Sequence, residues 1–309
     1  EHPNAPMTLA RMQQTMVLTI VVSAVAWLVF FGSHSPWVAW LGFGLIALGF
    51  TVVLAIEFML LSRLRNEDPS PAPDFAALFR AWRHECVCAV RVFGWRQPFR
   101  AQIIEDSHAQ HRPSAEAPLR GVVLIHGFLC NRGLWTPWLH ALNAEGRPFV
   151  ALNLMPVFGS IDAYAAQIDE AVTRLQSATG LAPVLVCHSM GGLAARAWLR
   201  AYAADARVAH IVTIGTPHHG TWLARHSKAR NGRQMRLQSA WLQELAAVES
   251  PARRAKFTCW YSNCDNIVFP ASTATLPGAE NCHLPAAGHM QLAFEPRVMS
   301  ASLAKIASV

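Results

Sequence analysis

Two long apolar runs dominate the beginning of the chain. They cover residues 16–32 and 37–61, and only residues 33–36 separate them. At about 1.5 Å of rise per helical residue, each run is long enough, or nearly so, to cross a hydrocarbon core of about 30 Å. We therefore expect residues 1–65 to form a helical hairpin that spans a membrane.

A secretory signal peptide is the alternative interpretation of the first run. Arg11 precedes the run, and residues 24–26 resemble a cleavage site. That site lies inside the apolar run, with no polar stretch before it, which is not typical of a cleaved leader. We favour the uncleaved hairpin.

The basic residues beside the two runs predict their orientation. Arg11 comes before the first run, the turn between the runs has no Lys or Arg, and Arg63, Arg65, Arg80 and Arg83 follow the second run. Because Lys and Arg gather on the cytoplasmic side of a membrane, both termini and the domain that follows are expected there. The sequence thus predicts an integral membrane protein whose domain lies on the cytoplasmic side.

Glu57 is a carboxylate inside the second run, one turn from its inner end. We expect its side chain to extend to the lipid–water interface. A functional carboxylate within the membrane is the alternative.

After the hairpin, the pattern becomes that of a globular domain. Residues 66–84 begin with a Pro-rich stretch and continue as a short helical pattern, which predicts a stiff linker and a helix near the membrane. The domain itself is expected over residues 85–309. Residues 86–95 and 98–104 alternate between apolar and polar side chains, which predicts two antiparallel strands at the start of its sheet.

The next runs are short and almost entirely apolar, as in buried parallel strands. They cover residues 121–125, 182–187, 209–214 and 256–261, and a helical stripe of apolar residues marks residues 160–178. Strands that alternate with helices in this way predict an α/β domain with a mostly parallel sheet.

Residues Cys187-His188-Ser189-Met190-Gly191 lie between one of these strands and a helix rich in small residues. This is the arrangement of a nucleophile elbow, in which a serine is exposed at a sharp turn above the sheet. The pattern departs from G-x-S-x-G only at Cys187, and cysteine is small and commonly buried. Ser189 is therefore the candidate nucleophile.

An oxyanion-binding loop is expected upstream, where the strand at residues 121–125 ends in His126-Gly127-Phe128. The backbone N–H groups of Phe128 and Met190 would then face the developing negative charge. A plain turn at the end of the strand is the alternative.

A serine nucleophile needs a base and an acid, and both follow in the order serine, acid, histidine. Asp265 comes just after the strand at residues 256–261, and His289 comes after a last strand at residues 280–285. His283 is the rival base, but it lies within that last strand. Three other carboxylates, those of Asp162, Asp169 and Asp205, precede these strands and are not favoured as the acid.

Several motifs in fixed order carry a resemblance to a known family. They are residues 124–129, the elbow at Ser189, residues 215–221, residues 265–268 and residues 288–290. Together they resemble bacterial α/β-hydrolase lipases of the triacylglycerol-lipase type. The resemblance implies an α/β-hydrolase fold with a small cap, and it gives His218 and His219 a structural role. Relatives that are exported keep a periplasmic location open.

Residues 222–255 fit the small cap that the resemblance implies. A basic stretch is followed there by an amphipathic pattern, which suits a segment that closes over a pocket and opens at a lipid surface. An ordinary helix on the surface of the domain is the alternative. The disulfide and the calcium site of some secreted relatives do not map onto this chain, so we predict neither a metal nor a cofactor.

Composition and charge fit a membrane protein of this kind. The 309 residues are 52% apolar, and the formal net charge is +7. The basic residues are scattered and lie beside the apolar runs, which favours anionic lipid headgroups over nucleic acid as the partner. Seven cysteines with no paired spacing are typical of a reducing compartment.

The sequence thus predicts a membrane-anchored serine hydrolase that acts on acyl esters of lipids. An acyltransferase or a thioesterase on the same fold is one alternative. A membrane-bound binding module without activity is another. A second copy of the chain or a folding partner that binds through the hairpin also stays open.

Overall fold

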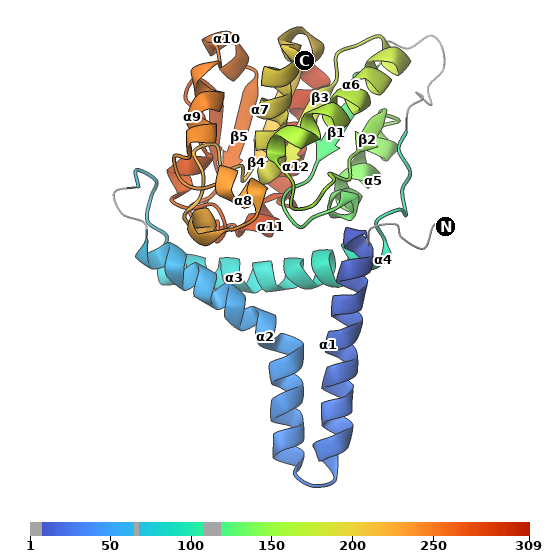
Figure 1. The fold of residues 1–309 in the computed structure, drawn as a ribbon, viewed down its shortest axis with the longest axis vertical. Helices are drawn as coiled ribbons and strands as arrows, with labels where there is room; N and C mark the ends of the chain where they lie inside the picture. Colours follow the sequence, from blue (N-terminus) through green and yellow to red (C-terminus); the bar gives the residue numbers. More distant parts are fainter. Residues whose placement is uncertain (1–7, 65–67, 108–118) are drawn as a thin grey trace.

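The computed structural model describes residues 8–64, 68–107 and 119–309, so Arg65 of the orientation argument lies outside the described residues. A helical hairpin projects from an α/β domain, and a third helix lies across the underside of that domain beside the hairpin (Figure 1).

The hairpin consists of α1 (Leu9–Gly32) and α2 (Pro36–Arg63). Both helices are long and apolar enough to cross a membrane, and only 6% and 11% of their most apolar windows are buried, unlike core helices of a soluble protein. The two helices approach closely at Gly42, where a Cβ atom would lie 1.9 Å from Nε1 of Trp27. The prediction of two long apolar helices at the beginning of the chain is confirmed.

The expected antiparallel strands at residues 86–95 and 98–104 are wrong. Helix α3 (Phe75–Ala89) continues into a π-helix, η1 (Val90–Arg96), and a last turn, α4 (Gln97–Phe99). Asp74 caps α3 by accepting the N–H of Ala77 at 2.6 Å. Apolar side chains such as Phe79, Val87 and Trp95 are exposed on the outer side of this helical segment. Because apolar residues occur on both of its sides, the pattern along the sequence imitates strand alternation.

The sheet in the described part of the chain has six parallel strands. They are β1 (Val122–Ile125), β2 (Phe149–Ala151), β3 (Val184–His188), β4 (His210–Ile214), β5 (Phe257–Tyr261) and β6 (Glu280–His283), in the order β2-β1-β3-β4-β5-β6. The register pairs Ile125 with Cys187 and Cys187 with Thr213. The three chain segments that follow β1, β3 and β4 therefore leave the sheet at the same edge.

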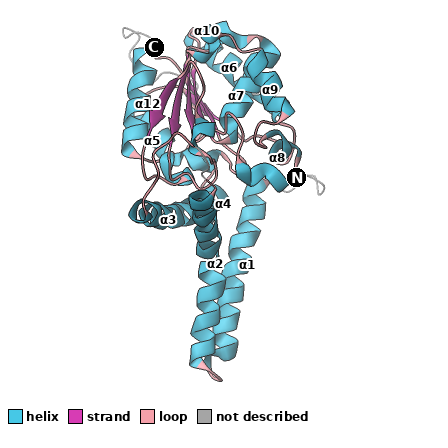
Figure 2. Cartoon of the chain, turned by 90° about the vertical axis from the view of Figure 1, so that its left-hand side faces the viewer, coloured by secondary structure: helices cyan, strands magenta, loops and turns pink. Residues whose placement is uncertain are grey.

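Helices cover both faces of the sheet (Figure 2). Helices α6 (Ala165–Thr179) and α7 (Met190–Tyr202) pack on one face, in a buried cluster that includes Trp198. Helices α5 (Thr136–Ala144) and α12 (Pro296–Ser308) pack on the other face, in a cluster that includes Trp138. The expected α/β architecture with a parallel sheet is thus confirmed.

Residues 222–255 form η5 (Trp222–His226), α8 (Arg230–Gln234), α9 (Ala240–Ala247) and α10 (Pro251–Arg254). Leu242 of α9 is buried in the same cluster as Leu193 of α7, so the segment rests on the domain. The remaining short elements are η2 (Arg132–Trp135), η3 (Ile161–Tyr164), η4 (Ala204–Arg207), η6 (Ala271–Ala274) and α11 (His289–Leu292).

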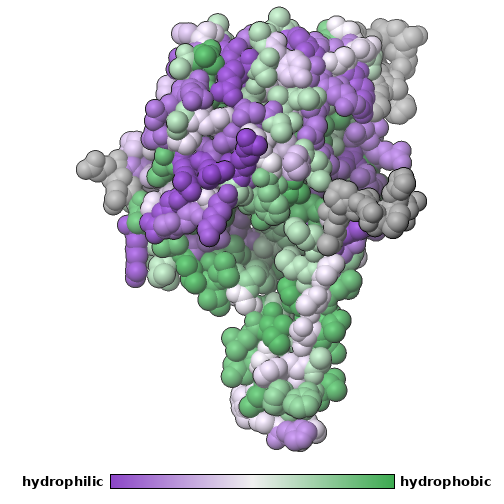
Figure 3. All heavy atoms as spheres, viewed as in Figure 1, coloured by the Kyte–Doolittle hydropathy of each residue, from purple (hydrophilic) through white to green (hydrophobic). Residues whose placement is uncertain are grey.

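Hydrophobic side chains gather on the hairpin and on the adjoining underside of the domain (Figure 3). The far end of the domain is largely hydrophilic in the same view. An apolar surface of this extent marks a face that meets lipid or another protein.

Candidate active site

Ser189 lies at the sharp turn between β3 and α7. Its backbone has φ 54° and ψ −128°, a strained conformation for a residue other than glycine. The turn is held because the N–H of Ser189 donates to the carbonyl of Ile214 at 2.9 Å, and the Thr216 hydroxyl donates to the Ser189 carbonyl at 2.8 Å. The structure thus places Ser189 where an elbow serine belongs.

Small residues around Ser189 allow its helix to approach the sheet. A Cβ atom on Gly191 would lie 2.3 Å from the carbonyl oxygen of Ile125. Cys187 is fully buried between Ile125 and Thr213, and burial raises the pKa of its thiol. Cys187 therefore acts as a small apolar residue in place of the missing glycine.

The loop after β1 lies directly against Ser189. A Cβ atom on Gly127 would lie 2.7 Å from the Cβ atom of Ser189. His126 stiffens this loop, because its Nδ1–H donates to the Gly127 carbonyl at 2.8 Å and its Nε2 accepts the N–H of Leu154 at 3.0 Å. Burial lowers the pKa of His126 to about 4, so this histidine is neutral and structural.

The two N–H groups expected to bind an oxyanion belong to this region. Phe128 lines the cavity that contains Ser189. Met190 is the first residue of α7, where a backbone N–H has no helical carbonyl to accept it. Their role in binding an oxyanion stays a prediction.

His289 and Asp265 are in direct contact. The Nδ1–H of His289 donates to Asp265 at 2.9 Å from Oδ2 and 3.0 Å from Oδ1. Asp265 Oδ1 also accepts the N–H groups of Ile267 and Val268. Burial by itself lowers the pKa of His289, but the charge and hydrogen bond of Asp265, together with nearby carboxylates, outweigh burial and raise it.

The chain after β4 passes close beside this pair. Gly215 has φ 59°, and a Cβ atom there would lie 3.0 Å from Asp265 Oδ2 and 3.2 Å from His289 Nδ1. Glycine is required at this position for both its conformation and its size.

The rival residues lie elsewhere. The carboxylates of Asp162, Asp169 and Asp205 pair with Arg200, Arg207 and Arg253, respectively. The imidazole of His218 is buried and bonds to the hydroxyl of Thr213 at 3.1 Å, in a structural position. His283 packs on Tyr261 with the ring centroids 5.1 Å apart.

A cavity of about 270 Å³ contains Ser189 and His289. Leu54 and Glu57 of α2, Glu85 and Ala89 of α3 and Phe93 of η1 also line it. None of the described residues 222–255 is among its lining residues. The walls of this cavity on the side of the hairpin therefore come from α2 and α3.

Glu57 does not extend to an interface as expected. Its Oε2 atom accepts a hydrogen bond from Nδ2 of Asn266, next to Asp265, at 2.7 Å. The carboxylate points into the cavity because the Asn266 amide, itself completely buried, needs an acceptor there.

The sequence interpretation also missed Glu85, Asn266 and His188. The rings of His188 and His289 lie 4.6 Å apart, and Nε2–H of His188 donates to the His289 carbonyl at 3.2 Å. For Glu57 the available signal was a single carboxylate inside an apolar run, whereas Glu85 follows Arg83 and His84 and has no such signal.

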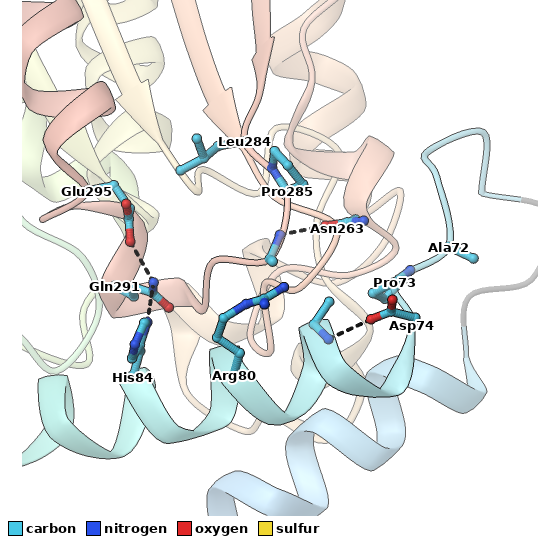
Figure 4. Close-up of a pocket in the computed structure, with 12 residues that line it drawn as sticks. Ala72, Pro73, Asp74, Arg80, His84, Asn263, Leu284, Pro285, Gln291 and Glu295 are labelled. Atoms are coloured by element: carbon cyan, nitrogen blue, oxygen red, sulfur yellow. Dashed lines mark hydrogen bonds between the residues drawn. The ribbon is translucent and has the colours of Figure 1, made fainter.

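A second cavity, of about 540 Å³, lies outside the site along the other side of α3 (Figure 4). There Gln291 of α11 donates from Nε2 to Nδ1 of His84 at 2.9 Å and to Glu295 at 2.6 Å. The described residues hold no group of three or more His, Cys, Asp or Glu side chains placed to bind a metal ion. All seven cysteines are described, and each is a free thiol.

Comparisons with known proteins agree with this architecture. Residues 121–266 match the family described as alpha/beta hydrolase fold. The chain has the α/β-hydrolase fold. No curated protein matches the sequence.

Solved lipase structures are similar to this fold. The mature lipase BlEst2 of Bacillus licheniformis is 17% identical, with a TM-score of 0.55, and the match covers 64% of this chain and 95% of that one. Lipase B of Aspergillus fumigatus is 18% identical, with a TM-score of 0.53, over 62% of this chain and 54% of that one. At this identity the likeness shows the fold alone.

Proposed function

We propose that the chain is a membrane-anchored serine hydrolase that cleaves carboxylic esters of lipids, as a lipase, esterase or phospholipase. One observation carries this proposal. Ser189, at a strained strand-to-helix turn, shares a cavity with His289, and Asp265 binds the imidazole of that histidine. A base bound by an orienting acid, in one cavity with a serine, is the arrangement of nucleophilic acyl transfer.

The residues take the following roles in the proposed reaction. Ser189 attacks the ester carbonyl, and His289 removes the proton from its hydroxyl and then gives it to the leaving alcohol. Asp265 holds the imidazole and stabilises its charged form. The N–H groups of Phe128 and Met190 bind the oxyanion, and water activated by His289 then releases the acyl group.

The cavity walls support a lipid substrate. Leu54 of α2 and Phe93 of η1 present apolar surface beside Ser189, and α2 is one of the two helices that are able to cross a membrane. An acyl chain would enter the cavity from the hydrocarbon region of the bilayer, along this apolar surface, and so reach Ser189. The lipases among the structural neighbours are consistent with this substrate class.

We also propose how the chain is organised around the membrane. Residues 1–65 form the anchor, and residues 66–84 connect it to the domain at residues 85–309. Residues 222–255 form a small cap that rests on the domain and does not line the cavity around Ser189 in this structure. The helix in the connecting segment continues past residue 85, so the connection is rigid at that point. The distribution of arginines places the domain on the cytoplasmic side of a bacterial inner membrane.

The first test is hydrolysis of a chain-length series of p-nitrophenyl acyl esters in detergent micelles, with Ser189→Ala beside the wild type. We expect the wild type to prefer long chains and the variant to lose at least about 10³-fold in turnover, because the nucleophile is gone. The variant should also fail to react with a fluorophosphonate probe while its melting temperature is unchanged.

Wild-type protein that neither turns over these esters nor reacts with the probe would contradict the proposal. Serine-dependent cleavage of acyl thioesters alone, or transfer of the acyl group to an alcohol, would instead assign a thioesterase or an acyltransferase.

A further inference from the structure

The helix that carries His289 is too short to hold itself in place. Helix α11 has four residues, and the N–H groups of a helix's first turn have no partners within the helix. Here they are bound from outside. The N–H of His289 donates to Oδ1 of Asn266 at 3.1 Å, and the N–H groups of Met290 and Gln291 donate to Glu85 at 2.8 and 3.0 Å.

Glu85 reaches this helix from α3, more than 200 positions earlier in the sequence. Its side chain is buried, and each carboxylate oxygen accepts one N–H of α11. Gly288 leaves room for it, because a Cβ atom there would lie 2.5 Å from Oε2 of Glu85. Burial raises the pKa of this carboxyl to about 7, while the two N–H groups of α11 favour its ionised form. Hydrogen bonds to the ionised form are stronger than neutral ones, so Glu85 clamps the backbone beside His289.

His84, the neighbour of Glu85 on α3, adds a second connection to the same helix. Its Nδ1 accepts the side-chain N–H of Gln291, and Figure 4 shows this bond between α3 and the domain, in the second cavity. Two consecutive residues of α3 thus bind α11.

Glu57 acts on the same helix through Asn266. Its Oε2 accepts the amide N–H of Asn266, which leaves Oδ1 of that amide to accept the N–H of His289. An amide side chain that is fixed at one end presents its other end in one orientation. The bonds form a chain from α2 to the backbone of His289.

We propose that Glu57 and Glu85 are positioning residues for His289, and that the hairpin and α3 are therefore parts of the catalytic unit as well as the anchor. This inference rests on the proposed function. In this inference, the two carboxylates orient the imidazole of His289 toward Ser189. Turnover then depends on the contacts of α2 and α3 with α11 and its neighbour Asn266.

The test compares Glu57→Leu and Glu85→Ala with the wild-type full-length chain in detergent micelles. A water-soluble p-nitrophenyl ester is the substrate, and the rate of fluorophosphonate labelling is a second readout of Ser189. We expect kcat and the labelling rate to fall about 10- to 100-fold with KM nearly unchanged, because a small displacement of a catalytic base costs this much.

Conservative variants separate positioning from packing. Glu57→Gln keeps an oxygen that accepts from Asn266, so it should restore most of the activity that Glu57→Leu loses. The groups that face His289 are Asp265, His188, Glu57 and Glu85. Burial raises the pKa of Glu85 to about 7, so this carboxyl is charged mainly above that pH. Glu85→Gln removes that charge, so the acid limb of kcat/KM should move to lower pH.

Glu244→Ala on the domain surface and Ser62→Ala on α2 are the matched controls, and both should behave as wild type. Unchanged kcat in Glu57→Leu and Glu85→Ala, a change in KM alone, or no recovery in Glu57→Gln would overturn the inference. If Glu85→Ala does not fold, Glu85→Gln decides, because its amide has one oxygen for the two N–H groups of α11, and unchanged kcat in that variant overturns the inference. The proposed function is tested separately, by whether turnover of the wild type depends on Ser189. If it does, a negative result with the Glu57 and Glu85 variants concerns only this inference.

Discussion

At the scale of single residues, the environment of His289 decides what this site is able to do. Its imidazole is buried, which alone would keep it neutral and make it a weak base. Asp265 reverses this effect by direct contact at 2.9 Å and raises the pKa of His289 above 6.5. The histidine therefore takes up a proton more readily, which is what a general base for a serine hydroxyl requires.

This pKa predicts the pH dependence of the proposed activity. The base must be neutral to accept a proton, so kcat/KM of the wild type should fall as the pH drops through a value above 6.5. Asp265→Asn should lower kcat by about 10³- to 10⁴-fold, because it removes the charge and the acceptor that orient the ring. Rates measured from pH 5 to 9 check both expectations, and a wild-type acid limb centred below 6.5 would contradict the first.

Single residues also show what could be inferred before the structure. Ser189, Asp265 and His289 each follow a strand, and their order along the chain restricts the candidates to few residues. Glu57 was misplaced because a carboxylate near the end of an apolar helix has solvent as its default partner. Its actual partner, Asn266, lies 209 positions away, and no local pattern records such a pair.

At the scale of elements, α3 was recognised as a helix, but its end was not. The sequence after residue 85 alternates like a strand, whereas the structure continues the helix through η1 to Phe99. Val92 faces the domain while Val90 and Trp95 are exposed on the outer side. Apolar residues on opposite sides of one helix remove the single stripe from which helices are recognised.

A buried ion pair joins α7 to the segment before α10, and it supports a prediction about stability. Arg196 binds Glu249 through two hydrogen bonds of 2.7 and 2.8 Å, with side chains that are 0% and 1% exposed. Glu249→Gln leaves the arginine charge buried without a counterion. We expect the free energy of unfolding to fall by about 3–5 kcal/mol.

Chemical denaturation in detergent, followed by tryptophan fluorescence, measures this change. The exposed pair of Arg174 and Glu170 is the control, and Glu170→Gln should change stability by less than about 1 kcal/mol. Equal effects of the two substitutions would show that burial does not determine the contribution of the Arg196 pair.

At the scale of the whole molecule, the N-terminal helices have two roles in our proposal. The two hairpin helices carry apolar surface for the bilayer, and one of them, α2, completes the cavity around Ser189 together with α3. The same arrangement explains the exposed apolar side chains on α3, such as Phe75 and Phe79, because that helix lies across the underside of the domain beside the hairpin (Figure 1). In our proposal, α3 therefore lies at the lipid–water interface.

The proposed membrane placement predicts a definite topology. After expression in bacteria, the chain should stay with the membrane through an alkaline carbonate wash. An epitope inserted between Ser33 and Ser35 should be accessible from outside in spheroplasts, and a C-terminal epitope only after permeabilisation. Access to the C-terminal epitope in intact spheroplasts would place the domain on the periplasmic side, and release by carbonate would contradict the anchor.

The sequence by itself determined the features that depend on neighbouring residues. Local sequence predicts the two apolar runs, the buried strands and the turn at Ser189. Helix period, strand burial and turn chemistry each depend on a few neighbouring positions. The order of Ser189, Asp265 and His289 then indicated which residues belong together.

Only the tertiary structure decided what surrounds that site. Glu85 holds α11, Glu57 reaches Asn266, and α2 and α3 form the wall of the cavity. These contacts join segments about 200 residues apart, and the partners are selected by which buried polar groups need a hydrogen bond once the chain is folded. A polar group needs such a partner only after folding has buried it, so no local pattern in the sequence predicts which partner it will have.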